Sequence, residues 1–287
     1  MEAIDRLDGM LRRFAVSAEQ FHLGPLCATQ HFAAVPGRGF LHILRDGVLT
    51  VSDESAETMR VVTEPSLFFY PRPYEHTFYA TAESGVDLAC ATLAFEGGSS
   101  HPLVAALPDC ITVPTAEVPG LESSLDLLTS ELDEFRCGHR HVIDRIFEIV
   151  LLKLLRYLLD HAHDGGDGGA NHETPPGLLG GLADPQLARA LSAMHEQPGA
   201  PWTLDTLART ANMSRSAFSA RFRELVGASP HDYLISWRLT VGKQLLHRRY
   251  PVSQVAAELG YTSSSFSRVF MQREGVSPRV WVETAAA

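Results

Sequence analysis

The last third of the chain carries one hydrophobic pattern twice. Apolar positions recur at helical spacing from residue 204, and the same pattern returns 48 residues later in one register without gaps. The coinciding pairs are Leu204 and Val252, Leu207 and Val255, Ala208 and Ala256, Phe218 and Phe266, Phe222 and Phe270, and Gly227 and Gly275. The repeat predicts two copies of one small helical unit, and therefore two equivalent surfaces at a fixed separation.

Each copy is predicted to fold as helix, short turn and helix. In the first copy Thr203 is placed to cap one helix, Asn212 tolerates the left-handed backbone of a tight turn, and Ser214 caps the next helix. Gly227 ends that helix. In the second copy the turn is Gly260-Tyr261, the cap is Thr262 or Ser263, and the stop is Gly275. Helix, turn and helix is the arrangement whose second helix enters the major groove of DNA.

The outer face of each second helix is polar and partly basic. Its candidate DNA-contacting residues are Arg215, Ser216, Ser219, Ala220 and Arg223 in the first copy and Ser263, Ser264, Ser267 and Arg268 in the second. Small hydroxyls allow close approach to base edges, and arginine can bind guanine or phosphate. An ordinary solvated helix face is the alternative interpretation, and the repeat argues against it. Residues 230–247 are predicted to form one longer helix that fixes the spacing between the two units.

The combined motifs resemble a known family. Leu-Ala-X-X-Ala-X-Met-Ser-Arg-Ser-X-Phe-X-X-X-Phe begins at residue 207, Gly-X-Ser-Pro follows at 227, and Val-Ala-X-X-Leu-Gly-Tyr-X-Ser-X-Ser-Phe-Ser-Arg-X-Phe begins at 255. Over residues 186–285 the chain is similar to the DNA-binding domain of AraC/XylS transcription regulators. The resemblance implies double-stranded DNA as a partner, with RNA polymerase as a further one. It assigns base reading to the serines above, Ala220 and Arg268. Ala220 departs from the polar residue usual there, so Arg215 and Arg223 are expected to contribute more.

Charge is distributed unevenly along the chain. The whole sequence has a formal net charge of −10. Residues 186–287 hold 12 Lys and Arg against 7 Asp and Glu, a net of +5, and residues 1–185 hold 12 against 27, a net of −15. A basic domain joined to an acidic one is expected where only the basic domain meets phosphate.

The front part of the chain changes from helical to strand periodicity. A short amphipathic helix is predicted from Ile4 to Phe14. The expected strands lie at 26–32, 39–44, 48–52, 59–62, 66–70, 77–80 and 86–95, separated by Gly and Pro turns. Seven short strands predict a β-sandwich or barrel. This half is similar to the cupin-type sensor domain found in one branch of the AraC family, so the predicted fold class is an α+β chain with a cupin-like β-barrel, a helical hairpin and an all-α DNA-binding domain.

Two helical stripes follow the strands. One runs from Leu121 to Leu132, and the other, unusually broad, runs from Ile143 to Leu158. The family resemblance implies an antiparallel helix pair used for homodimerisation, because a stripe wider than one core face suggests a second partner surface. The alternative is that both helices only cover the barrel.

The predicted domains are a sensor domain at 1–115, a helical dimerisation region at 116–163, a Gly/Asp/Pro-rich linker at 164–184 and the DNA-binding domain at 185–287. No signal peptide or membrane-spanning stretch is recognised, and four scattered cysteines fit reduced thiols. These features predict a cytoplasmic chain that has no membrane partner.

Candidate ligand chemistry lies in the barrel. The candidate metal ligands are His22, His42, His76 and Cys90, and imidazole with thiolate suits Zn²⁺. A second hypothesis makes Cys27 and Cys90 a redox pair, as the resemblance to oxidant-sensing cupin relatives implies. The third is that the histidines are hydrogen-bonded interior residues and Cys90 is a small hydrophobe. The residues leave all three open.

The function predicted from these features is transcription regulation rather than catalysis, and the family resemblance favours activation over repression. The cupin-like domain is expected to sense a small molecule, a metal ion or an oxidant and to tune DNA binding by the two helix-turn-helix units. Two alternatives remain at this point. One is a metal-dependent cupin enzyme fused to a DNA-binding anchor, and the other is an architectural DNA-binding protein whose affinity does not respond to a ligand.

Overall fold

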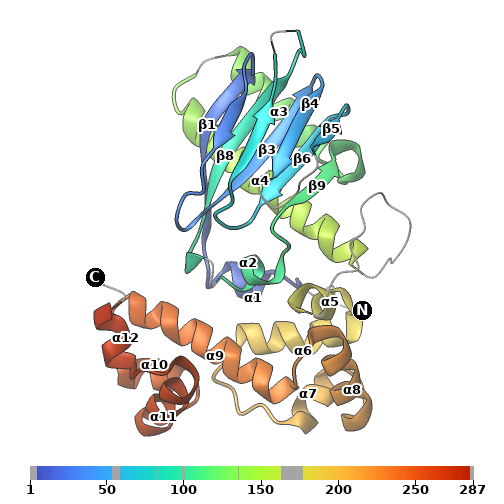
Figure 1. The fold of residues 1–287 in the computed structure, drawn as a ribbon. Helices are drawn as coiled ribbons and strands as arrows, with labels where there is room; N and C mark the ends of the chain where they lie inside the picture. The colour runs from blue at the N-terminus through green and yellow to red at the C-terminus, as the bar shows by residue number, and fades with distance from the viewer. Residues whose placement is uncertain are drawn as a thin grey trace. The chain divides into compact units, whose positions relative to one another are not determined.

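The chain folds as two compact units in the computed structural model, which describes residues 5–53, 59–81, 83–98, 101–134, 136–162 and 177–284. The barrel unit spans residues 15–160. The helical unit joins the N-terminal segment up to Phe14 to the chain from His161 onward. Sheet-rich first and helical second, the two units confirm the predicted fold class (Figure 1).

Two antiparallel sheets build the barrel unit. The strands are β1 (Val16–Pro25), β2 (Gln30–Phe32), β3 (Arg38–Asp46), β4 (Leu49–Asp53), β5 (Arg60–Val62), β6 (Ser66–Tyr70), β7 (His76–Tyr79), β8 (Asp87–Phe95) and β9 (Ile111–Pro114). The five-stranded sheet has the order β1-β8-β3-β6-β9, and the four-stranded sheet has the order β2-β7-β4-β5. Successive side chains of a strand point to opposite faces of its sheet. One buried cluster, to which both sheets contribute, includes Phe32, Phe40, Phe68 and Phe78. This is the core of the unit.

The first strand was the main error of the sequence prediction. Six of the seven expected strands match β3 to β8, but the expected strand at 26–32 is strand only at 30–32, and β1 precedes it. The register of β1 against β8 shifts between Gln20 and His22, so its burial does not alternate cleanly. Backbone N–H groups of Ala18 and Gln20 on this edge strand donate to Glu148 and Asp144 of the following helical segment. These distant carboxylates cover a sheet edge that no local pattern reveals.

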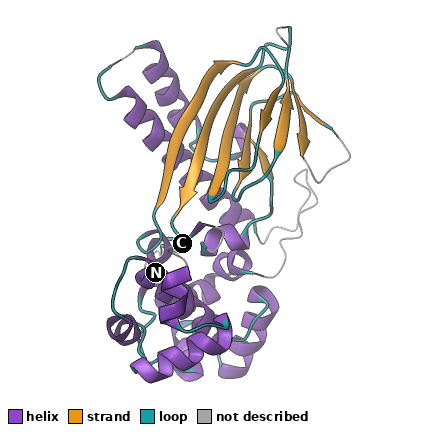
Figure 2. Ribbon diagram, turned by 60° about the vertical axis from the view of Figure 1, so that its left-hand side comes forward, coloured by secondary structure: helices purple, strands orange, loops and turns teal. Residues whose placement is uncertain are grey.

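The helices of the barrel unit are α2 (Pro102–Ala106), the 3₁₀ turn η2 (Thr115–Glu117), α3 (Glu122–Asp133) and α4 (His139–His161). Figure 2 shows helices along one face of the strands, and Figure 1 identifies α3 and α4 there. The outward side chains of the five-stranded sheet, such as Ile43 and Phe69, are fully buried. Most of the broad stripe of α4 is buried too: Ile143, Ile146, Phe147, Val150, Leu151, Leu154 and Leu155. Covering the sheet accounts for the width of the stripe, and homodimerisation remains a prediction.

The helical unit contains α1 (Asp8–Leu11), α5 (Leu178–Ala183), α6 (Pro185–Glu196), α7 (Leu204–Thr210), α8 (Arg215–Val226), α9 (Pro230–His247), α10 (Val252–Glu258), α11 (Ser263–Glu274) and α12 (Pro278–Thr284). The two predicted helix pairs are α7 with α8 and α10 with α11, and the predicted connecting helix is α9. The core of the helical unit contains one pair of large aromatic side chains from each copy of the repeat. These pairs are Phe218 with Phe222 and Phe266 with Phe270, and all four side chains are fully buried.

Two predicted boundaries differ from the structure. The linker prediction included residues 178–183, which form the buried helix α5 against α6 and α8; residues 163–176 lie outside the described part. The sensor-domain prediction included residues 5–14, which the structure groups with the helical unit. Within the described ranges no helix is long and apolar enough to cross a membrane.

Candidate functional site

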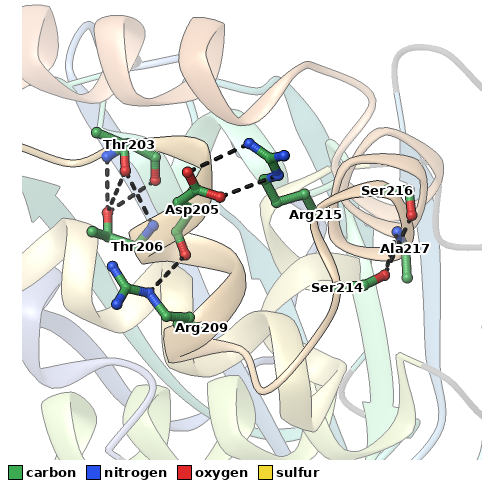
Figure 3. Close-up of polar contacts among 8 residues, drawn as sticks. All are labelled: Thr203, Asp205, Thr206, Arg209, Ser214, Arg215, Ser216 and Ala217. Carbon is green, nitrogen blue, oxygen red and sulfur yellow. Dashed lines mark hydrogen bonds and ion pairs between the residues drawn. The ribbon is translucent and has the colours of Figure 1, made fainter.

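Local contacts hold the first helix-turn-helix. Thr203 and Thr206 form a capping box at the start of α7, with the Thr203 hydroxyl accepting from the Thr206 N–H at 3.1 Å (Figure 3). Asn212 has φ 54° in the turn. Ser214 accepts from the Ala217 N–H at 3.3 Å and starts α8, and Gly227 ends α8 with φ 78°. These contacts confirm the predicted caps, turn and stop at Thr203, Asn212, Ser214 and Gly227, and the role of Thr206 was not predicted.

The two faces of α8 differ in the way a recognition helix requires. Phe218 and Phe222 are buried on the inner face. The predicted contact residues lie on the other side: Arg215, Ser216, Ala220 and Arg223 are exposed, and Ser219 is half-buried. No hydrogen bond or ion pair within the described residues occupies the Arg223 side chain. The helix therefore presents small side chains flanked by two arginines.

Asp205 is a candidate site residue that the sequence did not predict. Its Oδ1 lies 3.1 Å from Nε of Arg215, and its Oδ2 accepts from Nη1 of Arg215 at 3.4 Å (Figure 3). The pair joins the start of α7 to the start of α8 and holds the guanidinium at the turn. In the second copy the equivalent positions are Ser253 and Ser263, so the two units are not electrostatically equivalent. The sequence did contain a signal for this ion pair. The two positions carry opposite charges in the first copy, whereas both are serines in the second copy.

The second candidate recognition helix is α11. Thr262 caps it by accepting from the Ser265 N–H at 3.2 Å, which resolves the choice between Thr262 and Ser263, and Gly275 ends it with φ 76°. Ser263, Ser264 and Arg268 are exposed, and Ser267 is half-buried. In the described part of the chain the Arg268 guanidinium has no hydrogen-bond or ion-pair partner, so its charge is fully available to a ligand.

Other arginines near these helices are already bound. Arg273 donates to Asp232 of α9 at 2.8 Å, and Arg221 donates to Asp184 at 3.2 Å. The Ser229 hydroxyl and then Arg273 lower the pKa of Asp232. These pairs fasten α11 and α8 to neighbouring elements. Among the described residues, the unpaired positive charge on the candidate DNA face therefore comes from Arg223 and Arg268, while Arg215 is held by Asp205.

The barrel unit buries a histidine pair between its sheets. Nε2 of His42 lies 2.9 Å from Nε2 of His76, and both residues are almost fully buried. Aromatic rings surround them: Phe32 and Tyr70 stack on His76 with ring centroids 4.8 and 4.0 Å away, and Phe40 stacks on His42 at 5.7 Å. Burial lowers the pKa of His76 to about 4 and holds that of His42 well below its usual value. Both rings are therefore neutral at physiological pH.

The hydrogen bonds fix how the pair shares its protons. Nδ1 of His76 lies 3.1 Å from the Tyr74 carbonyl oxygen, which can only accept. His76 therefore carries its proton on Nδ1 and accepts at Nε2, so Nε2 of His42 donates. Nδ1 of His42 is then an unprotonated nitrogen, and it is buried without a hydrogen-bond partner among the described residues. The pair offers one bare lone pair among the aromatic rings of Phe32, Phe40 and Phe78.

The four predicted metal ligands are only partly brought together. Cys90 is the cross-strand partner of both His42 and His22. Among the four described side chains, the hydrogen-bond distance joins His42 and His76. His22 instead lies 3.2 Å from the Gly24 carbonyl. The described ranges contain no group of three or more His, Cys, Asp or Glu side chains placed to hold a metal ion. The four-ligand zinc site is not assembled, and metal binding by the His42–His76 pair remains a prediction.

The predicted redox pair is also separated. Leu26, next to Cys27, hydrogen-bonds to Val86, whereas Cys90 lies four residues further along β8. At about 3.3 Å per residue, Val86 and Cys90 are roughly 13 Å apart, and Cys27 follows Leu26 in the direction away from Cys90, so the two cysteines are beyond the reach of a disulfide. Cys27 is exposed, and Cys90 is buried with a raised thiol pKa. The structure thus does not bring Cys27 and Cys90 together.

A polar network beside the histidines was not predicted. Asp53 accepts from Arg60 at 2.7 Å and from the Tyr70 hydroxyl at 2.8 Å, and its cross-strand partner is His76. The sulfur of Cys110 lies 3.6 Å from the Arg60 guanidinium. Burial is the main cause of the raised pKa of Tyr70. The network binds β4, β5 and β6 at the end of the barrel where His76 begins β7.

Comparison with known proteins adds family information. The chain matches the family model described as cupin over residues 5–160 and the model described as helix-turn-helix domain over residues 207–284. A putative AraC-like transcription regulator of Streptomyces antibioticus is 32% identical over 176 residues, which are 60% of this chain and 55% of the relative. The RCS-specific HTH-type transcriptional activator RclR of Escherichia coli is 36% identical over 111 residues, 38% of this chain and 39% of the relative.

A solved structure is similar to about a third of the chain. The DNA-binding domain of AdpA, a global transcriptional factor determined in complex with a target DNA, is 31% identical, with a TM-score of 0.33. That similarity covers 35% of this chain and 92% of the AdpA domain. The chain spans about half the length of the first curated relatives that it matches, 55% and 53% of two Streptomyces proteins.

Proposed function

The chain belongs to the AraC-type helix-turn-helix transcriptional regulators with an N-terminal cupin domain, and from this premise we propose how it works. The two helix-turn-helix units bind successive major grooves on one face of double-stranded DNA. The barrel unit senses a small molecule, a metal ion or an oxidant and tunes that binding. The chain acts as a homodimeric activator that works together with RNA polymerase.

One observation carries the DNA-binding proposal. Both α8 and α11 bury a Phe pair on one face and turn hydroxyls and arginines outward on the other, with matching N-caps and left-handed glycine stops. Such helices place small polar side chains against base edges while the arginines reach guanine or phosphate. The connecting helix α9 has 18 residues, a length of about 27 Å at 1.5 Å per residue. This is comparable to one turn of DNA, about 34 Å.

Selection from a randomised duplex pool tests this proposal. The full chain should enrich a sequence with two preferred blocks whose centres lie about 10 base pairs apart. Affinity for the enriched duplex should fall steeply with salt, because phosphate contacts release counterions. A pool that shows no enrichment, or a single block, would contradict binding by two units.

The sensing proposal is supported by the His42–His76 pair, because the bare Nδ1 of His42 and the aromatic lining provide a specific polar point inside an apolar core. Metal analysis of chain purified without chelator, repeated on the double variant His42→Ala, His76→Ala, separates the classes of effector. Stoichiometric metal that the double variant loses would identify a metal-centred sensor. Equal metal content in both proteins would leave an organic ligand or an oxidant, to be distinguished by titration while DNA affinity is followed.

The enzyme alternative has less support. A non-haem iron centre uses two histidines and a carboxylate with open positions. Asp53 is the carboxylate opposite His76, but both of its oxygens bind Arg60 or Tyr70. We therefore propose a regulator without turnover. Iron-dependent conversion of any substrate by the purified chain would overturn this choice.

A further inference from the structure

The segment from residue 5 to residue 14 is built into the helical unit, although the cupin family match begins at residue 5. Met10 and Phe14 are 0% and 1% exposed. The Phe14 ring lies 5.6 Å from the ring of Trp237 on α9. At Gly9 an added Cβ would lie 3.0 Å from the Cβ of His195, so α1 packs with its backbone against α6. The amphipathic stripe of this segment therefore belongs to the core around α6 and α9.

Arg13 connects three helices of that unit. Its Nε donates to the His195 carbonyl at 3.2 Å, and its Nη2 donates to the Glu196 carbonyl at 3.0 Å. Nη1 lies 3.7 Å from Glu258 of α10, and the Arg13 carbonyl accepts from Gln244 of α9. One residue thus contacts α6, α9 and α10.

The contact with α6 satisfies a general need of helices. The last carbonyls of a helix have no partner within it, and the C-terminal end carries partial negative charge. A guanidinium matches both features, because it is planar, cationic and offers several donors in a fixed geometry. Arg13 therefore works as a cap that comes from the other end of the chain, while its remaining nitrogen faces the carboxylate of α10.

These contacts matter because they bridge the two halves of the repeat. Helices α6 to α8 form the first half, α10 to α12 form the second, and α9 connects them. We infer that residues 5–14 are a brace that sets the orientation of the two recognition helices, with Arg13 and Phe14 as positioning residues for DNA binding. This inference rests on the proposed function for its DNA readout. It also makes the barrel unit an insertion between two segments of the helical unit.

A second bridge allows the brace to be removed without unfolding. Arg238 of α9 donates to the carbonyls of Pro198 at 2.6 Å and Ala200 at 2.9 Å, and its guanidinium lies 5.0 Å from the ring centroid of Tyr261. This bridge uses no residue of the N-terminal segment. Loss of the Arg13 contacts should therefore loosen the relative orientation of the halves while each half keeps its own core.

Hydrogen exchange on the full chain tests the brace without DNA. Arg13→Ala and Phe14→Ala should make amides of α9, α10 and the last turn of α6 exchange about tenfold faster, while the strands of the barrel unit are unchanged. Arg12→Ala is the matched control, since Arg12 is 78% exposed and its ion pair is with Asp8 of the same segment. Unchanged exchange in α10, or an equal change in the control, would overturn the inference.

Measurements of DNA affinity then distinguish a positioning role of Arg13 from an effect on the stability of the helical unit. On a duplex with both preferred blocks, Arg13→Ala should bind about tenfold more weakly than the wild-type chain. On a duplex with one block, the two proteins should differ less than about twofold, because one recognition helix needs no partner. Phe14→Leu should restore most of the affinity that Phe14→Ala loses. An equal loss on both duplexes would show a merely structural role. If even the wild-type chain bound no duplex, the proposed function would fail, and the exchange result alone would decide about the brace.

Discussion

At the scale of single residues, Arg268 is the side chain whose loss should be easiest to interpret. It is exposed on α11, and no other described residue binds its guanidinium. Arg268→Ala should weaken binding to the selected duplex by about 1–3 kcal/mol and relax the preference at one base pair. The measurement is a Kd for the selected duplex and for its single-base variants. A uniform loss on all variants would show that Arg268 binds phosphate only.

Asp205 offers a prediction of the opposite sign. It neutralises Arg215 at the turn of the first unit, and both side chains are exposed. Asp205→Asn should raise affinity for DNA of any sequence, because it removes a negative charge near phosphate and frees a guanidinium. One added phosphate contact should steepen the slope of log K against log salt by about 0.9. Asp126→Asn on α3 is a charge-matched control. An unchanged slope in Asp205→Asn would show that Arg215 leaves Asp205 when DNA binds.

His195 predicts how stability depends on pH. Burial lowers its pKa to about 3, and its Nε2 lies 2.6 Å from the Tyr233 hydroxyl. Between its unfolded pKa of about 6.5 and this folded value, only the unfolded state binds the proton. The free energy of unfolding should therefore fall as pH falls below about 6.5, by about 1.4 kcal/mol per pH unit from this group. Urea unfolding of wild type and His195→Gln at several pH values tests it, and the variant should show a shallower slope by about one proton.

The role of a residue could be predicted from the sequence when its contacts are with residues close to it in the chain. Thr203, Asn212 and Ser214 act on neighbours within a few residues, so their roles could be inferred from the chain alone. The contact between His42 and His76 depends on how strands in two different sheets face each other. Sequence placed both histidines in one candidate site, but it could not show that the His22 ring would lie against the Gly24 carbonyl instead.

At the scale of elements, two glycines should differ strongly when replaced. Gly275 has φ 76° at the end of α11, and within the described ranges no neighbouring atom lies within 4 Å of a Cβ built there. Gly275→Ala should cost only the left-handed backbone, about 1 kcal/mol. A Cβ on Gly199 would instead overlap the Glu258 carbonyl oxygen at the turn of the second helix-turn-helix. Gly199→Ala should therefore cost about 3 kcal/mol or more. Thermal unfolding measures both, and equal costs would contradict the close approach.

Elements were predictable where one periodicity ran without interruption. Helices α9 and α11 have buried aromatic or aliphatic stripes and local caps, and their predicted extents agree with the structure. Strand β1 has a register shift and an edge that Asp144 and Glu148 cover from more than a hundred residues away. No local signal carries that pairing, so β1 could not be placed from the chain alone.

At the scale of the whole molecule, the order of the chain does not match the division of its structure. Met10 and Phe14 predicted an amphipathic segment, but they could not indicate which core would receive it. The choice of core depends on how the surfaces fit together. Gly9 lets the backbone of α1 approach α6, and the Phe14 ring packs against the ring of Trp237. Helix α5 was hidden for a related reason, because its two glycines and short length resemble a linker while its side chains are all buried.

The structure limits which side chains of α3 and α4 could form the predicted homodimer interface. The stripe that suggested it is largely buried, so an interface on α3 and α4 must use the apolar side chains that remain exposed: Leu127, Val142 and Ile149 at 46%, 37% and 42%. Val142 and Ile149 are seven residues apart and share one face of α4.

If this face of α4 joins two copies of the chain, Ile149→Arg should dissociate the dimer, since an arginine would be buried opposite its own symmetry mate. Light scattering across a range of concentrations measures the mass. Arg156→Ala, one further repeat along the same face, should leave a dimer intact because it removes no apolar area. A wild-type chain that is monomeric throughout, or a dimer indifferent to Ile149→Arg, would remove α4 as the interface.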